Sequence, residues 1–465
     1  MYSIPQHIDP NKIFIVQFSE LQGRIDPLFY VSDLNKFNTC IYKSVCLKNV
    51  ISNIKSGIGA GKQDQSNETD GIIQIRPTNI DENGFLKYDK NIYIPKNGDN
   101  IKLEIDDVLF NNTNSQELVG KTAILKESQE LSCSNHITRI KVYKNIIIPD
   151  YLWIILNGYQ KNKIFYSLCT NWNNQSGIGI DLLKSIKIPL PPIDTQQQIV
   201  NVYQTAYHQK QQKEAQAQAL LASIDDYLLG ELGITMPTTE HNVNDIVSCH
   251  GFELNRHNPV VKKGRLLLTG FREVGGGRLD PVNSLYLSKK SKSVIYENIL
   301  LNEIAVIGKG QSISSKEVIT GKYPVIAGGQ SSPYSHQEYN CEANVITISA
   351  SGAYAGYVWY HDYPVFASDC SVIRSKNETI FSTKYIFEVL RAKQKEIYLL
   401  QQGAGQPHVY PADLAKILVP VVPETIQNKL IGHINSLRQQ ALLLQKEATQ
   451  ALQQAKEKIE KMILG

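Results

Sequence analysis

The 465-residue sequence repeats itself once over most of its length. The segment Gly23–Pro27 (GRIDP) returns as Gly277–Pro281 (GRLDP), 254 residues later. Because insertions and deletions are tolerated in surface loops, an offset that falls along the chain indicates two diverged copies of one domain. The further matches, in chain order, are Ile51, Ile54 and Gly57 with Ile304, Ile307 and Gly310; Val108 and Gly120 with Val345 and Gly356; Tyr151 and Leu156 with Tyr385 and Leu390; Asp181 and Lys184 with Asp413 and Lys416; and Pro189 and Pro192 with Pro420 and Pro423.

Each copy ends in a proline-rich segment that precedes a long helical stretch. The first stretch follows Ile188–Thr195 (IPLPPIDT) and runs without Gly or Pro to Gly230. The second follows Val419–Thr425 (VPVVPET) and runs to Gly465, interrupted only by Gly432. Proline before a helix, Asp or Thr near its start and glycine at its end are typical boundary signals. We therefore expect two long helices, the first spanning about residues 195–229, or roughly 50 Å.

The apolar spacing in both stretches alternates between three and four residues, which is typical of a coiled-coil seam. The pattern favours pairing of the two helices, although each could instead pack only on its own domain. In the second stretch the seam positions are Leu430, Ile434, Leu437, Ala441, Leu444, Ala448, Ala451, Ala455, Ile459 and Met462. In the first they are Ile199, Val202, Ala206, Ala217, Leu220, Ile224 and Tyr227, interrupted by the polar residues Gln209 and Lys213.

The composition permits several classes of partner and excludes few. A net charge of +4 and a pI near 8.4 allow a polyanionic partner without requiring one. The seven cysteines are single and contain no Cys-x-x-Cys pair, which argues against a zinc site or disulfide framework and for reduced thiols. No apolar run approaches 18 residues and the N-terminus lacks a signal-peptide pattern, so we expect a cytoplasmic protein without a membrane partner.

Within each copy the pattern is mixed α and β. Strands are expected at Gly71–Ile75, Val108–Phe110, Val345–Ile348 and Tyr357–Tyr360, and helices at Tyr151–Leu156 and Tyr385–Leu390. The turns between them are rich in Asn, Gln, Ser, Gly and Tyr and poor in acids. Such side chains hydrogen-bond to phosphates and base edges, although polar turns are also common without any ligand.

A search for catalytic motifs finds none. Ser56–Lys62 (SGIGAGK) lacks the first glycine of a phosphate loop, and Gln63 stands where a magnesium-binding Ser or Thr would be. Leu190–Ile193 (LPPI) lacks the leading Asn or Asp and the aromatic residue of an amino-methyltransferase motif. No zinc-binding histidine pair and no nucleophile elbow occur. We therefore expect a protein that is not an enzyme.

The order of domain, helix, domain and helix resembles the specificity subunit of Type I restriction-modification systems, over nearly the whole chain. The start of the second helix, Glu424–Gln427, departs from the glutamine-rich pattern of the first. The matching segments are Arg24–Pro27 and its repeat, Ile188–Ile199 (IPLPPIDTQQQI), Asp225–Gly233 (DDYLLGELG), Asn344–Tyr360 (NVITISASGAYAGYVWY) and Gly403–Val409 (GAGQPHV).

The resemblance implies an α+β fold. Two duplicated mixed α/β target-recognition domains, residues 1–192 and 236–422, would be separated by helices 193–235 and 423–465 that form an antiparallel coiled coil with pseudo-twofold symmetry. Each domain would read one half of a bipartite DNA target, with the reading centres about 15 base pairs apart.

The resemblance also implies the partners. Two methyltransferase subunits would bind S-adenosylmethionine, restriction subunits would use ATP and Mg²⁺, and this chain would hold no cofactor. Two alternatives remain open, namely a specificity subunit of a Type IIB-like enzyme and a coiled-coil scaffold or decoy without catalytic partners.

Loop residues whose side chains suit base edges or phosphates are candidates for DNA contact, because amides and Arg can make bidentate bonds to bases while Lys mainly meets phosphate. In the first copy these are Lys62, Arg76, Asn112, Asn114 and Arg139, and in the second Lys309, Gln311, Ser351, Tyr354, Gln402 and Gln406.

Overall fold

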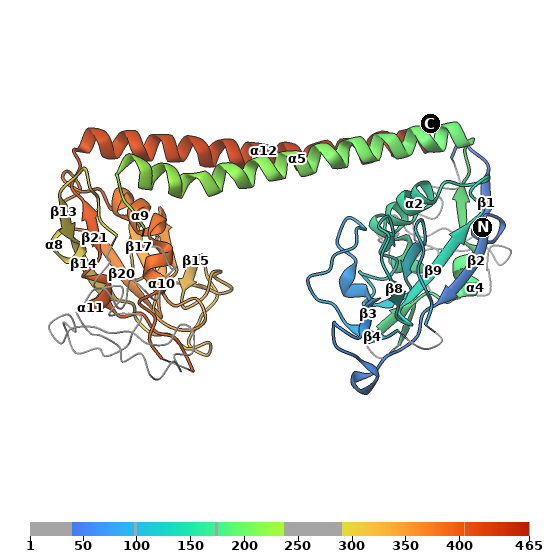
Figure 1. The fold of residues 1–465 in the computed structure, drawn as a ribbon, viewed down its shortest axis with the longest axis horizontal. Helices are drawn as coiled ribbons and strands as arrows, with labels where there is room; N and C mark the ends of the chain where they lie inside the picture. Colours follow the sequence, from blue (N-terminus) through green and yellow to red (C-terminus); the bar gives the residue numbers. More distant parts are fainter. Residues whose placement is uncertain (1–39, 97–99, 173–174, 237–290, 404, 465) are drawn as a thin grey trace, which may run out of the picture. The chain divides into compact units, whose positions relative to one another are not determined.

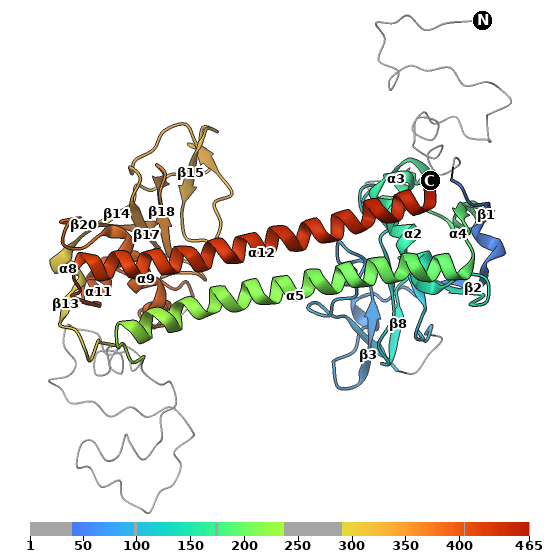
Figure 2. The ribbon, with the colours of Figure 1, turned by 90° about the horizontal axis from the view of Figure 1, so that it is seen from above.

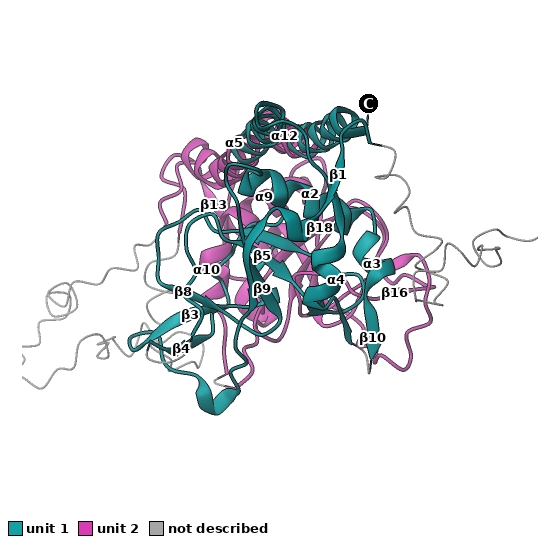
Figure 3. Ribbon diagram, turned by 90° about the vertical axis from the view of Figure 1, so that its right-hand side faces the viewer, with its two compact units in different colours: residues 1–212, 447–465 teal, residues 213–446 magenta. Residues whose placement is uncertain are grey.

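The structure is a computed structural model that describes residues 40–96, 100–172, 175–236, 291–403 and 405–464. The repeated segments Gly23–Pro27 and Gly277–Pro281 lie outside these ranges. Among the described residues no helix is both long and apolar enough to cross a membrane. The chain divides into two compact units, coloured separately in Figure 3: unit 1 comprises residues 1–212 and 447–465, and unit 2 residues 213–446. The domain boundaries expected from the sequence stay a prediction.

Unit 1 is built on a four-stranded antiparallel sheet in the order β2-β9-β5-β7, against which helix α2 packs (Figure 1). A second sheet, β4-β3-β8, pairs β3 antiparallel with β4 and parallel with β8. Two smaller sheets have the orders β1-β12 and β10-β11-β6. The elements are β1 (Ser44–Cys46), β2 (Ile51–Ser56), β3 (Gly71–Ile75), β4 (Tyr93–Pro95), β5 (Val108–Asn111), β6 (Thr113–Asn114), β7 (Thr122–Ile124), β8 (Leu131–Cys133), β9 (Ile137–Val142), β10 (Thr170–Trp172), β11 (Gln175–Gly177), β12 (Lys187–Pro189), α2 (Pro149–Lys161), α3 (Ile164–Leu168), α4 (Ile180–Ser185) and the 3₁₀ turns η3 (Leu47–Asn49), η4 (Lys62–Asp64) and η5 (Pro77–Asn79).

Unit 2 repeats this topology. Its four-stranded sheet has the order β14-β20-β17-β18, its three-stranded sheet the order β16-β15-β19 with the same mixture of antiparallel and parallel pairs, and β13 pairs with β21. The duplication inferred from the sequence is therefore confirmed at the level of strand order. The elements are β13 (Asn298–Leu300), β14 (Ala305–Lys309), β15 (Tyr323–Ile326), β16 (Ser335–His336), β17 (Val345–Ser349), β18 (Val358–His361), β19 (Phe366–Ala367), β20 (Cys370–Ser375), β21 (Leu418–Pro420), α8 (Leu301–Ile304), α9 (Thr383–Ala392), α10 (Gln394–Tyr398) and α11 (Pro411–Leu414).

The predicted strands and helices are confirmed, with small shifts at their ends. Strand β3 has the predicted bounds, β5 and β17 extend one residue further, and β18 begins at Val358 rather than Tyr357. Helices α2 and α9 are longer than the predicted cores and extend over Pro149–Lys161 and Thr383–Ala392. The repeated tyrosines of these helices are fully buried, and each hydroxyl donates to a proline carbonyl, Tyr151 to Pro189 and Tyr385 to Pro420, at 2.8 Å.

The two long helices are confirmed as α5 (Ile193–Glu231) and α12 (Glu424–Leu464). Both run through both units. In unit 1 the start of α5 packs beside the end of α12, where Ile199 and Tyr203 share one core with Leu452, Ile459 and Ile463. The helices are therefore antiparallel, as Figure 2 shows. Each buried large apolar side chain contributes roughly 1.5–3 kcal/mol.

In unit 2 the end of α5 packs beside the start of α12 in the same antiparallel sense. Ile224 and Leu228 share a core with Leu430 and Ile434, and the same core includes residues of α9. The helices thus pack on their own domains as well as on each other, so both packing modes considered from the sequence occur together. The buried stripe of α12 follows the predicted seam, including Ala448, Ala455 and Ile459, except that Leu452 and Ile463 are buried in place of Ala451 and Met462.

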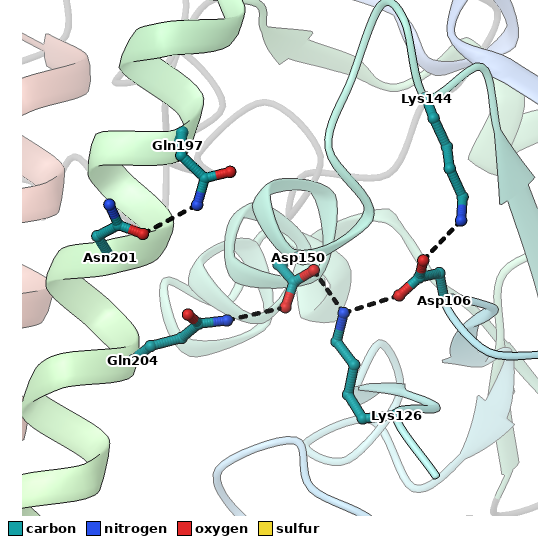
Figure 4. A network of polar contacts seen from close by, with 7 residues as sticks. All are labelled: Asp106, Lys126, Lys144, Asp150, Gln197, Asn201 and Gln204. Carbon is teal, nitrogen blue, oxygen red and sulfur yellow. Dashed lines mark hydrogen bonds and ion pairs between the residues drawn. The ribbon is translucent and has the colours of Figure 1, made fainter. Parts of the chain in front are cut away.

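A polar network joins α5 to the domain body of unit 1 (Figure 4). Lys126 donates to Asp106 at 2.8 Å and to Asp150 at 2.7 Å, and Gln204 of α5 donates to Asp150 at 3.2 Å. Burial alone would raise the pKa of Asp106, but the hydrogen bonds from Lys126 and Lys144 lower it below its usual value. The hydrogen bond between Asp150 of α2 and Gln204 fastens α2 to α5.

Candidate nucleic-acid interface

Four segments of unit 1 meet at one end of its four-stranded sheet. Strands β2 and β5 finish there and the antiparallel strand β9 begins there, so the flanking loops are brought together. We call this set the unit 1 loop cluster. It comprises residues 57–63, 111–116, 133–136 and the β10–β11 hairpin with its following residues, 170–172 and 175–180.

Asn112 holds this cluster together from inside. Its side chain is 8% exposed, and its amide nitrogen donates to Thr138 Oγ1 at 2.8 Å, to the Asn135 carbonyl at 3.1 Å and to Ser56 Oγ at 3.3 Å. Its backbone carbonyl accepts the amide of Ile178 at 2.9 Å. One amide therefore joins the ends of β2 and β9 to the loop that follows β5, and the β10–β11 segment is attached through the same residue.

Unit 2 has an equivalent loop cluster where β14 and β17 finish and β20 begins. It comprises residues 310–313, 350–356, 367–369, 402–403 and 405–408. The loop after the first strand of the sheet is bonded in the same way in both units. The Gly57 amide donates to the Ile137 carbonyl at 3.0 Å, and the Gly310 amide donates to the Cys370 carbonyl at 2.8 Å. A Cβ atom at either glycine would overlap a backbone carbonyl oxygen of the neighbouring segment, which explains why glycine recurs at this position of the repeat.

The chemistry of both clusters suits a polyanion. The unit 1 loop cluster contains no Asp or Glu and is rich in Asn, Gln and Ser. The unit 2 loop cluster has a single acid, Asp369, whose carboxylate accepts the hydroxyl of Ser351. Amide and hydroxyl side chains bond to phosphates and base edges, and the scarcity of carboxylates avoids repulsion of the DNA backbone.

The structure brings four of the five predicted DNA-contact residues of unit 1 to this end. Lys62 is exposed at the start of η4, and Asn114 is partly exposed in β6. Arg76 lies beside the cluster and donates to the Ala60 carbonyl and to Gln74, each at 3.0 Å. Asn112 is in the cluster, but its amide is used internally.

Arg139 lies apart from the loop cluster. It is in β9, opposite Lys55 and Leu109, and its guanidinium donates to Asn53 Oδ1 at 2.7 Å and to the Lys102 carbonyl at 3.3 Å. These two hydrogen bonds hold the Arg139 guanidinium against the sheet. The sequence gave no indication that this side chain would be held there.

All six predicted residues of unit 2 lie in or next to its loop cluster. Lys309 is exposed at the end of β14, and Gln311 and Gln406 are exposed within the cluster. Tyr354 is 46% exposed. Ser351 and Gln402 each form a β-bridge with His408, and the Gln402 amide donates to Asp413 at 2.7 Å.

Among the residues of the clusters that were not predicted, His408 and Trp172 stand out. His408 connects two segments of the unit 2 loop cluster, and Trp172 is 48% exposed in the hairpin of unit 1. His408 lies in a glycine-containing polar segment and Trp172 in an amide-rich one. That local composition is the only feature of the sequence that could have indicated them. Within the described ranges, no group of three or more His, Cys, Asp or Glu side chains could hold a metal ion.

The sequence profile of the Type I restriction modification DNA specificity domain matches residues 42–220 and 294–454, one match in each copy of the repeat. The chain belongs to this family. A curated relative, the putative type I restriction enzyme MjaX specificity subunit of Methanocaldococcus jannaschii, is 32% identical over 162 residues, which cover 34% of this chain and 37% of that protein. The match thus spans little more than a third of that relative's length.

One solved structure, from work on complex assembly and conformational transition of the type I R-M system, shows the same fold, with a TM-score of 0.52 at 13% identity over 90% of this chain and 96% of that chain. The S subunit of a Type-I restriction-modification system from M. genitalium aligns with a TM-score of 0.44 at 15% identity, covering 91% and 96%.

Proposed function

We propose that this chain is the DNA-recognition subunit of a Type I restriction-modification complex and catalyses no reaction itself. Each unit reads one half of a bipartite, asymmetric DNA target through its loop cluster. The observation that carries the proposal is the repetition of one acid-poor loop cluster on the same strand order, with different side chains in the two copies. Because the side chains differ, the two half-sites are expected to be unlike.

The chemistry is proposed to belong to partner subunits. Methylation of a base within a duplex requires flipping that base into an enclosed catalytic pocket. Two methyltransferase subunits, each with S-adenosylmethionine, would dock on α5 and α12, and restriction subunits would supply ATP- and Mg²⁺-dependent cleavage. The complex would work in the cytoplasm, where its DNA substrate is found.

A reciprocal pair of variants tests the assignment of one half-site to each unit. Methylome sequencing of the host first defines the motif. We expect Lys62→Ala with Asn114→Ala to lower overall affinity through Lys62 and to weaken discrimination at one half-site only through Asn114, and Gln311→Ala with Gln406→Ala to weaken discrimination at the other. Each lost base contact should reduce discrimination by about 1–3 kcal/mol, or roughly 5- to 150-fold. The measurement is the affinity of the assembled complex for duplexes in which either half-site is scrambled.

Lys187→Ala is the matched control, because Lys187 is exposed in β12, outside the loop cluster. It should leave both half-sites unchanged. If both double variants retained full discrimination at both half-sites, the loop clusters would not be the reading surfaces. If the wild-type chain bound neither DNA nor a methyltransferase, the chain would be a scaffold and the proposed function would be wrong.

A further inference from the structure

Trp172 is the most exposed of the chain's three tryptophans. Trp153 is 3% exposed and its indole N–H donates to two backbone carbonyls, whereas Trp172 is 48% exposed. A single exposed aromatic is common on protein surfaces and indicates nothing alone. The position of Trp172 and the way it is held are what distinguish it.

The indole ring is held in place by a glycine across the hairpin. In β10–β11, Trp172 pairs with Gln175 and Thr170 pairs with Gly177. A Cβ atom at Gly177 would lie 2.5 Å from Cη2 of the indole, so the ring rests on the one position of β11 that has no side chain. The ring is thereby ordered before any partner arrives, which reduces the entropy lost on binding.

The hairpin is also fixed to the reading surface. Strand β11 pairs with β6, placing Ser176 opposite Asn114 and Gly177 opposite Thr113. Asn171 accepts the Ser176 hydroxyl, which braces the two strands of the hairpin against each other. Trp172 therefore belongs to the same three-stranded sheet as Asn114, with its side chain on the opposite face, beside Gln175 and Gly177.

The surroundings of the indole favour DNA over an acidic or basic protein surface. Gln175 is exposed directly across the hairpin from it, Asn171 is exposed next to it in β10, and the segments 111–116, 133–136, 170–172 and 175–180 contain no acid and no Lys or Arg. Amides bond base edges, and aromatic or apolar side chains pack on bases and sugars or wedge between base steps. An ordered indole flanked by amides combines both kinds of contact.

We propose that Trp172, held on β11 by Gly177, packs against base edges and sugars in the groove of the half-site read by unit 1. This inference rests on the proposed function and adds a residue that determines affinity at one half-site. Unit 2 lacks the feature, because its equivalent segment 402–408 contains no tryptophan. The effect of Trp172 is therefore confined to one half of the target.

The test combines binding with a site-resolved readout on the assembled complex. Trp172→Ala should weaken binding to the target by roughly 5- to 150-fold, as for loss of one base–aromatic contact. Trp172→Phe should retain part of that affinity, and Gly177→Ala should weaken binding by displacing the ring. Discrimination at the half-site read by unit 2 should persist in all three variants, which shows that the complex still assembles and that the loss is confined to unit 1. Tyr143→Ala is the matched control, because Tyr143 is 47% exposed outside the loop cluster, and it should bind like the wild type.

Hydroxyl-radical footprinting with mass spectrometry reads the contact directly. Target DNA should protect Trp172 but not Tyr143. Protection of Trp172 by methyltransferase subunits before DNA is added would identify a protein contact and overturn the proposal. Normal binding by Trp172→Ala, with Trp172 accessible in the DNA complex, would also overturn it while leaving the proposed function intact.

Discussion

At the scale of single residues, two buried glutamines explain how each long helix is attached to its domain. Gln196 accepts the amide of Ile148 at 2.9 Å and donates to the carbonyls of Ile146 at 3.1 Å and Pro191 at 2.9 Å. Gln427 makes the same three bonds in unit 2, with Ser382, Ile380 and Val422. The second helix start thus keeps the one glutamine that matters for packing, although the neighbouring glutamines are absent.

We expect Gln196→Ala to destabilise unit 1 by about 2–4 kcal/mol, because three backbone groups would lose their partner in a buried site. Native-state hydrogen exchange of the full chain measures the effect in each unit separately. Gln197→Ala is the control, since Gln197 is exposed and bonds only to Asn201, and it should cost less than about 0.5 kcal/mol. Equal losses for the two variants would contradict the role given to Gln196.

Lys456 gives unit 1 an unusual dependence on pH. It lies with Lys161 in a groove of about 230 Å³ between α2 and α12. Burial, contact with Lys161 and the charge of Lys210 lower the pKa of Lys456 to about 7, with Glu82 opposing the shift. An unfolded lysine keeps its proton up to about pH 10.5, so between these values the unfolded chain binds more protons than the folded chain.

The stability of unit 1 should therefore rise with pH between about 7 and 10.5. Below about pH 7 Lys456 is protonated in the folded state too, so the destabilisation caused by burying its charge should be fully present there. Lys456→Met should remove this part of the slope and stabilise unit 1 most near neutral pH. The measurement is the difference in unfolding between variant and wild type at pH 7 and pH 9. Lys458→Met, at an exposed position, should leave the slope unchanged. An equal change of slope in Lys458→Met would refute the assignment of the slope to Lys456.

At the scale of elements, α12 continues through the glycine that interrupts its sequence pattern. Gly432 lies within Glu424–Leu464, and a Cβ atom there would meet nothing within 4 Å. The helix tolerates this glycine because α12 is fixed on both sides by buried seam residues, including Leu430 and Ile434.

We predict that Gly432→Ala stabilises unit 2 by about 0.5–1 kcal/mol, because alanine restricts the unfolded chain and favours the helix. Thermal or denaturant unfolding measures the gain. Gly158→Ala, at an equally open position in α2, should stabilise unit 1 by a similar amount. A loss of stability from Gly432→Ala would show that another group occupies the space beside Gly432.

At the scale of the whole molecule, α5 is the first of two helices, with α12, that continue from one unit into the other. Its 39 residues correspond to roughly 58 Å of helix. The boundary between the units falls within it, after Gln212, near the polar interruption of the seam at Gln209 and Lys213. We propose that this helix sets the spacing between the half-sites.

Four residues inserted between Gln209 and Lys213 should lengthen α5 by about 6 Å and turn the following residues by about 40°. We expect the methylated motif to keep both half-sites while its spacer grows by about two base pairs. A second variant with four residues also inserted after Lys446 restores the pairing of α12 in both units and should methylate more efficiently. Methylation of the original spacing at full efficiency would show that the helix does not set the distance.

The duplication, the strand positions, the two long helices and their seam could be predicted from the sequence, because they depend on local periodicity and on matched residues such as Gly57 and Gly310. The family could be inferred from the same order of segments. Helix ends shifted by a few residues, because they depend on where a neighbouring sheet stops covering the apolar face.

The fate of individual polar side chains was decided only by the tertiary structure. Asn112 and Asn114 are two residues apart in one amide-rich loop, yet one is buried as a tie between strands and the other remains partly exposed. Arg139 is held on the sheet by Asn53, 86 residues away along the chain. Trp172 joins the unit 1 loop cluster through β11 and β6, a pairing between segments about 60 residues apart. Periodicity and composition report on neighbours in sequence, whereas exposure and hydrogen bonding are set by neighbours in space.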